Sequence, residues 1–132
     1  PMQLGRRPSE PVDERTSAFY ETLLACAARP EVAGGSFTLL EPRSAWWGNG
    51  SHDGFVAFVW QRGDARLLVA VNLAPTRGQC YLALPVPALA GRTVVLRDLL
   101  GSARYERLGD DLVRVGLYLD EPGFAALAFE LT

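Results

Sequence analysis

Two adjacent tryptophans, Trp46 and Trp47, are the side chains of this sequence whose chemistry is easiest to name. They precede Gly48 and a glycine-rich loop, and an indole ring offers a flat apolar platform to the C–H face of a sugar ring. Successive side chains of an extended strand point to opposite faces, so we expect at most one of the two indoles to be exposed. The pair predicts either a carbohydrate platform or packing in the core or against another domain, and packing is the favoured interpretation.

The single histidine, His52, is followed by Asp53, which raises the question of a catalytic dyad. Adjacent residues point apart in an extended chain, and no GxSxG motif supplies a serine nucleophile. We therefore expect His52 to lie in a solvated turn.

Two acidic pairs, Asp110-Asp111 and Asp120-Glu121, could serve acid–base catalysis or bind a metal ion. Both pairs lie beside glycine or proline, where aspartate commonly makes turn hydrogen bonds. Neither pair has the alternating carboxylate spacing of a calcium loop. The sequence predicts turns at both places, with no catalytic residue, no metal ligand and no cofactor.

Two short motifs also coincide with turn signals. Residues 62–64 spell Arg-Gly-Asp, a tripeptide known from adhesion ligands, but they fit a hairpin turn between two apolar runs. Residues 49–51 fit a glycosylation acceptor, and Asn-Gly is equally a turn signal. We favour the turn at both positions.

Composition narrows the class of protein. The chain has 132 residues, 48% of them hydrophobic, which suits one domain with a core. Its formal net charge is −2, so it has no basic excess to neutralise phosphates, and nucleic acid is not expected as a partner. All 13 basic residues are arginine, and they are scattered along the chain. The cysteines, Cys26 and Cys80, are far apart and are expected to be buried free thiols, and no Cys/His cluster indicates zinc. No apolar run approaches the ~20 residues needed to span a bilayer.

The first 31 residues read like the end of something larger. After the irregular, proline-bounded segment 6–11, a helix is expected to begin near Asp13 and to end at Pro30. Its apolar residues recur every three or four positions, and this stripe needs a surface to cover it: Thr16, Phe19, Tyr20, Leu23, Leu24 and Ala27.

From residue 32 onwards the pattern changes to short strands separated by Gly and Pro. Segment 55–60, FVAFVW, is apolar on both alternating faces, which predicts a central strand covered on both sides. Turn signals at 63–64 and 109–111 predict hairpins. Seven or eight strands at ~8–12-residue spacing indicate an antiparallel β-sandwich; they are expected at 36–40, 55–60, 66–73, 79–84, 93–96, 105–108, 112–115 and 124–131.

Taken in order, these pieces resemble the C-terminal end of the alpha-amylase family of glycoside hydrolases. Segment 1–24, PMQLGRRPSEPVDERTSAFYETLL, is similar to the last strand, loop and helix of that family's catalytic barrel. FVAFVWQRGDARLLVAVNLAP, QCYLALP, LRDLLGSARYERLGDDL and GLYLDEPGF are similar to successive pieces of its C-terminal β domain. Residues 121–126, EPGFAA, depart from the family pattern, so the resemblance implies no role for the last hairpin.

The resemblance implies two parts: residues 1–31 end a catalytic barrel, and residues 32–132 form an all-β sandwich. It implies that the catalytic carboxylates of a retaining mechanism lie upstream of residue 1 and that this segment is not itself an enzyme. The expected partners are the upstream barrel and an α-glucan, the latter through Trp46 or Trp47, with self-association through the helix in the isolated segment. The alternative is a stand-alone carbohydrate-binding module. The cellular compartment stays open.

Overall fold

Short strands dominate the part of the chain that the structure describes. The computed structural model describes residues 25, 29, 32 and 34–132. Within 34–132 the strands are β1 (Ser36–Leu40), β2 (Phe55–Arg62), β3 (Ala65–Asn72), β4 (Gly78–Leu82), β5 (Thr93–Asp98), β6 (Arg104–Leu108), β7 (Leu117–Glu121) and β8 (Ala126–Leu131). The helical segments are η1 (Ser51–Gly54), η2 (Pro87–Leu89) and α3 (Gly109–Arg114).

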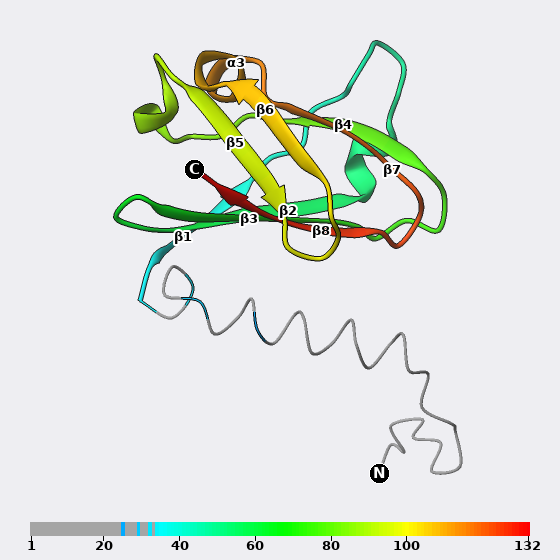
Figure 1. Cartoon of the computed structure of the whole chain (residues 1–132). Coiled ribbons are helices and arrows are strands. Elements are labelled where there is room, and N and C mark those ends of the chain that lie inside the picture. Colours follow the sequence, from blue (N-terminus) through cyan, green and yellow to red (C-terminus); the bar gives the residue numbers. More distant parts are fainter. Residues whose placement is uncertain (1–24, 26–28, 30–31, 33) are drawn as a thin grey trace, which may run out of the picture.

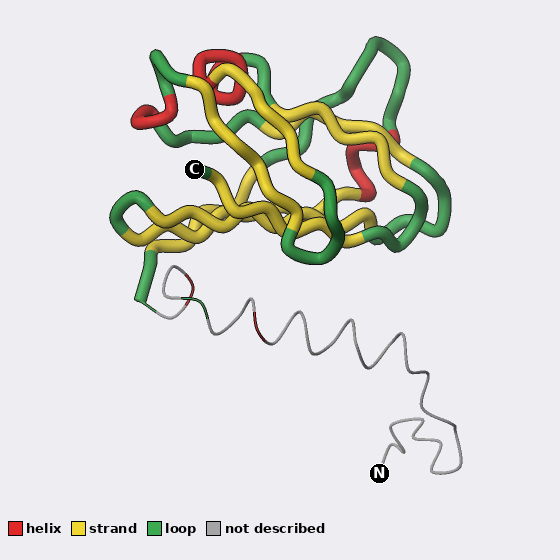
Figure 2. Tube along the Cα trace, in the orientation of Figure 1, coloured by secondary structure: helices red, strands yellow, loops and turns green. Residues whose placement is uncertain are grey.

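The strands pair into two antiparallel sheets. Six strands follow the order β1-β2-β3-β8-β5-β6, and β4 pairs with β7. Arg43 and Tyr81 exchange two backbone hydrogen bonds of 3.0 Å, which tie the chain after β1 to β4. β1, β2, β3 and β8 form one layer, β4 and β7 lie opposite, and β5 and β6 curve towards them (Figures 1 and 2). The predicted antiparallel β-sandwich is confirmed.

The core lies between the two layers. Inward-pointing side chains of β2, β3 and β8 meet those of β4, β5 and β7 in one cluster, which includes Val59, Leu68, Leu82, Leu96, Leu119 and Phe129. Cys80 of β4 is fully buried there as a free thiol, as predicted. Burial raises its pKa to about 12, so the thiol stays protonated and unreactive in the folded state.

The β2–β3 hairpin and the face of β8 agree with the sequence pattern. β2 pairs with β3 over its whole length, and Gly63 adopts φ +59° in the two-residue turn between them. The Arg-Gly-Asp motif therefore forms the predicted hairpin turn. In β8, Phe129 and Leu131 are buried in the core and Leu127 packs against it, so the predicted face is confirmed.

The hairpin expected at 109–111 and the strand expected at 112–115 are wrong, because this segment forms α3. A Cβ on Gly109 would lie 1.6 Å from the Leu89 carbonyl oxygen, so glycine is what allows α3 to pack closely on η2. Leu112, one turn later, is buried in the core. Asp110 and Asp111 occupy the first helical turn, where negative charge is favourable.

The predicted N-terminal helix and its stripe (Thr16, Phe19, Tyr20, Leu23, Leu24 and Ala27) lie outside the described residues. So do Cys26 and the residues assigned to the last strand and loop of a barrel. Within the described part, no helix is long and apolar enough to cross a membrane.

Candidate functional site

The tryptophan loop, residues 43–50, projects from the sandwich between β1 and η1 (Figure 1). Trp46 is 54% exposed and Trp47 is 98% exposed. The expectation that at most one indole would be exposed is wrong. Alternation applies only to a strand, whereas here Trp46 lies in a bend and Trp47 in a turn.

Polar groups hold this loop in shape without help from the indoles. The Asn49 backbone N–H donates to the Trp46 carbonyl oxygen over 3.1 Å, and Gly48 has φ +84°. Such a φ at the third of four turn residues is typical of a type II turn, which favours glycine. The Ser44 hydroxyl lies 2.6 Å from the Trp46 carbonyl oxygen and 2.7 Å from that of Asn49. The tryptophans are therefore presented on a defined turn.

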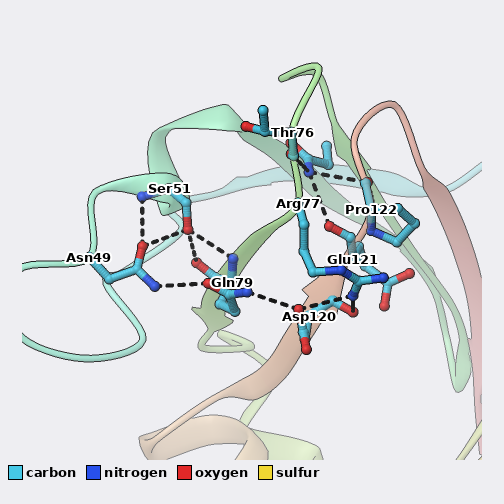
Figure 3. Close-up of polar contacts among 9 residues, drawn as sticks. Asn49, Ser51, Thr76, Arg77, Gln79, Asp120, Glu121 and Pro122 are labelled. Atoms are coloured by element: carbon cyan, nitrogen blue, oxygen red, sulfur yellow. Dashed lines mark hydrogen bonds and ion pairs between the residues drawn. The ribbon is translucent and has the colours of Figure 1, made fainter.

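A hydrogen-bond network connects the tryptophan loop to β4 and β7 (Figure 3). The Asn49 Nδ2 donates to Gln79 Oε1 over 2.9 Å, and Asn49 Oδ1 accepts from the Ser51 backbone N–H over 2.9 Å. Gln79 Nε2 donates to Asp120 Oδ1 over 2.9 Å, and Arg77 Nη1 donates to the same oxygen over 3.1 Å. These hydrogen bonds, that of Gln79 foremost, lower the pKa of Asp120 below its ordinary value.

This network contradicts one prediction from the sequence and agrees with another. Asp120 and Glu121 are the last residues of β7, so the predicted turn at that pair is wrong. Asn49 uses its side-chain amide to brace the turn, in line with the turn interpretation of residues 49–51.

His52 lies in η1 and contacts its neighbour. The His52 Nε2 is 3.3 Å from Asp53 Oδ1, and Nδ1 is 3.3 Å from the Asn49 carbonyl oxygen. The two side chains do not point apart, because the segment is a 3-10 helix instead of an extended strand. The described residues hold no group of three or more His, Cys, Asp or Glu side chains placed to share a metal ion.

The outer face of the six-stranded sheet carries a cluster of exposed apolar side chains that sequence reasoning missed. Phe37 is 54% exposed and Leu39 is 66% exposed. The Phe37 ring lies 5.4 Å from that of Phe58 and 5.3 Å from that of Trp60. The strand at 55–60 is central, as predicted, but it is not covered on both sides, since Val56 is also exposed.

Further along the same face, residues that precede β1 are in contact with the sheet. Val32 packs on a small cluster around Leu67, which is buried although it points away from the core. Arg29 forms an ion pair with Glu130 of β8, and Arg97 Nη2 donates to Glu130 Oε1 over 2.6 Å. The hydrogen bond from Arg97, and then that from Arg29, lower the pKa of Glu130. The outer face thus has a covered half and an exposed aromatic half.

Comparison with known proteins gives matches of fold and none of sequence. No protein-family model and no curated protein matches the chain. An alpha-amylase from Geobacillus thermoleovorans, solved with acarbose, matches with a TM-score of 0.55 and 19% identity, over 79% of this chain and 20% of that one. The chain shares its fold with part of an alpha-amylase.

A trehalulose synthase from Pseudomonas mesoacidophila matches with a TM-score of 0.50 and 15% identity, over 87% of this chain and 17% of that one. The chain therefore spans about a fifth of the length of these solved structures. At such identities the likeness establishes the fold, so the predicted resemblance to alpha-amylase-type enzymes is confirmed at that level. The outer face and the tryptophan loop are thus two candidate contact surfaces on an alpha-amylase-type β-sandwich.

Proposed function

We propose that this chain is the non-catalytic β domain of an alpha-amylase-type glycoside hydrolase that acts on α-glucans, and that it packs on and stabilises the catalytic barrel. The catalytic residues of a retaining mechanism then lie upstream of Pro1, and the segment alone turns over no glucan. The observation that carries this proposal is the exposed aromatic half of the outer face on a sandwich with an alpha-amylase fold.

Two features of the outer face support an intramolecular partner. Exposed apolar side chains that gather in one place, as Phe37, Leu39 and Val56 do, are typical of interaction surfaces. Arg29 and Val32 already bring the preceding chain onto this face. The apolar stripe predicted between Asp13 and Pro30 comes just before Val32 in the sequence. Packing of this stripe on the same face would extend the covered area. In the isolated segment, a second copy could take the place of the barrel.

The test uses the whole protein from the natural gene. We expect an open frame of at least ~250 residues before the codon for Pro1, the length of an α/β barrel. In that protein, the double variant Phe37→Lys/Leu39→Lys should lose its glucan-hydrolysing activity faster than the wild type when it is heated. Leu108→Lys introduces one lysine at an exposed leucine of β6, away from the outer face, and is the control for the added charge.

Three results would contradict the proposal. These are a reading frame that starts at or near Pro1, a purified 1–132 chain that hydrolyses starch, and equal inactivation rates for the double variant and the Leu108→Lys control. The double variant should lower the melting temperature of the 1–132 chain only slightly, because both side chains are more than half exposed and the lost packing is the contact of Phe37 with Phe58 and Trp60.

The tryptophan loop favours a second candidate function, a weak glucan contact that could also serve a stand-alone carbohydrate-binding module. The supporting observation is that Trp47 is 98% exposed on a turn that is braced by polar groups. A tryptophan held so far out of the core serves recognition better than stability.

Affinity electrophoresis of the 1–132 chain in soluble starch tests this contact. Retardation that Trp47→Ala abolishes would support it, and Leu73→Ala, another exposed apolar residue outside the loop, should leave the mobility unchanged. Equal mobility of wild type and Trp47→Ala in starch would remove the tryptophan loop as a glucan contact.

A further inference from the structure

The sandwich is open along one seam, between β6 and β7. β6 ends the six-stranded sheet and β7 pairs only with β4, so neither strand pairs across the seam. A groove of about 330 Å³ lies between them, and it takes its walls from both strands and its floor from the core side of β5 and β8. This volume lies at the lower end of the range for small-ligand sites.

Aromatic rings line this seam groove on both sides. Tyr105 of β6 is half-exposed and its ring packs against that of Phe129 at 6.0 Å. Tyr118 of β7 is also half-exposed, and its ring lies 5.3 Å from that of Tyr81. Each tyrosine thus has neighbours that fix its position while part of its surface stays open to the groove. Rings held in this way can contact the C–H faces of a ligand at low entropic cost.

The polar groups of the groove are mostly hydrogen-bond acceptors with spare capacity. The Glu121 carboxylate has no hydrogen-bond partner within the described part of the chain, and burial raises its pKa. Asp98 Oδ1 accepts from the Leu100 N–H over 3.0 Å, and this is the one hydrogen bond of its carboxylate in the described part. Arg107 supplies donors on the opposite wall. Such a lining would satisfy a ligand rich in hydroxyl groups.

Two other kinds of occupant fit less well. An added β-strand would have to pair with β6, but Arg104, Glu106 and Arg107 line that strand, and charged edges oppose strand addition. An anionic ligand would meet the carboxylates of Asp98, Asp120 and Glu121, with Arg107 as the one arginine in the lining to offset them. A neutral polyol with apolar ring faces avoids both conflicts.

We propose that the seam groove between β6 and β7 binds a neutral oligosaccharide of the α-glucan class, at a site separate from the tryptophan loop. The choice of an α-glucan rests on the proposed function, whereas the neutral, hydroxyl-rich character of the ligand rests on the groove itself.

The experiment is a titration of maltotetraose into the ¹⁵N-labelled 1–132 chain, followed by amide chemical shifts and by calorimetry. We expect shift changes at β6 and β7. The double variant Tyr105→Phe/Glu121→Gln should bind about tenfold more weakly, because it removes a hydroxyl and a charged acceptor. Glu106→Gln makes the same carboxylate change on β6 outside the groove and should bind like the wild type.

The Trp47→Ala variant distinguishes the seam groove from the tryptophan loop as the binding site. It should leave the chemical shift changes at β6 and β7 in place. The proposal is overturned if maltotetraose causes no shift changes there, if those changes disappear in Trp47→Ala, or if Glu106→Gln weakens binding as much as the double variant does. Binding of cellotetraose in preference to maltotetraose would overturn the α-glucan class. The gene and inactivation tests of the barrel partner are independent of this titration, so either proposal can fail alone.

Discussion

Asn72→Ala should destabilise the sandwich strongly, because this one amide joins the loop after β3 to the end of β7. Asn72 is 1% exposed. Its Nδ2 lies 3.0 Å from the carbonyl oxygen of Thr76, 3.3 Å from that of Glu121 and 3.2 Å from that of Pro122, and its Oδ1 accepts from the Ala74 N–H over 3.1 Å. Figure 3 shows these carbonyls converging beside the network of Gln79 and Asp120.

The expected loss of stability follows from the number of hydrogen bonds that Asn72→Ala removes. An amide nitrogen has two hydrogens to share among the three carbonyl groups, and the Asn72 side-chain oxygen makes one further bond, so alanine removes three bonds. At about 1 kcal/mol net for each, the free energy of unfolding should fall by about 3 kcal/mol. Asn72→Asp should cost more than Asn72→Ala, because it replaces the donors with a carboxylate that faces three carbonyl oxygens.

Urea denaturation of the 1–132 chain, followed by tryptophan fluorescence, measures this free energy. Gln61→Ala is the matched control, because it removes an amide from the neighbouring strand β2 whose side chain makes no hydrogen bond within the described part of the chain. A loss below about 1 kcal/mol for Asn72→Ala, or an Asn72→Asp variant more stable than Asn72→Ala, would refute the assignment of stability to these bonds.

Three further outcomes are expected. Gly109→Ala should cost about 3 kcal/mol or prevent folding, because its Cβ would lie 1.6 Å from a backbone oxygen of η2. Cys80 should react with a disulfide reagent at pH 8 only as guanidinium unfolds the chain, because burial raises its pKa to about 12. Glu130→Gln should flatten the acid limb of the stability curve: the folded pKa of Glu130 is lowered, chiefly by its hydrogen bond with Arg97, so its contribution is present above the ordinary value of 4.5 and is lost as pH falls through the folded pKa.

Each of these outcomes has a control. Gly50→Ala adds a methyl group where nothing lies within 4 Å and should be neutral, in contrast to Gly109→Ala. A Cys26→Ser background leaves Cys80 as the single thiol; fast labelling of the folded protein would contradict its burial. Parallel acid limbs for wild type and Glu130→Gln, in thermal melts between pH 3 and pH 6, would show that the ion pairs of Glu130 add nothing to stability.

Local pattern was sufficient where a strand and its turn are consecutive in the sequence. The central position of segment 55–60, the Gly63-Asp64 turn and the apolar face of Leu127, Phe129 and Leu131 were each predicted correctly, although the expected cover on both faces of segment 55–60 is wrong. In these cases the side chains that decide the structure lie within a few residues of one another, and period-two alternation is direct evidence of a half-buried strand.

The sequence pattern predicted the wrong structure where packing between distant segments determines the fold. Segment 109–114 contains Gly, two Asp and Val, which are poor helix formers, and it becomes α3 because Gly109 fits against η2 and Leu112 reaches the core. The pairing of β4 with β7 joins segments more than 30 residues apart, and it places Asp120 and Glu121 on a strand where their neighbours suggested a turn. The seam groove depends on that pairing and is invisible in the sequence for the same reason.

Apolar alternation shows which side chains share a strand face but not what covers that face. More than half of an ordinary protein surface is apolar, so one exposed tryptophan such as Trp47 is weak evidence of a partner. Phe37, Leu39 and Val56 form a cluster on a rigid sheet, beside a half that Val32 and Arg29 already cover, and clusters of this kind are rare on surfaces that stay exposed. The outer face is therefore the better-supported contact surface. Equal rates of heat inactivation for Phe37→Lys/Leu39→Lys and Leu108→Lys in the whole protein would be strong evidence against an interdomain contact there. Loss of starch binding in Trp47→Ala would be weaker evidence for a glucan contact at the tryptophan loop.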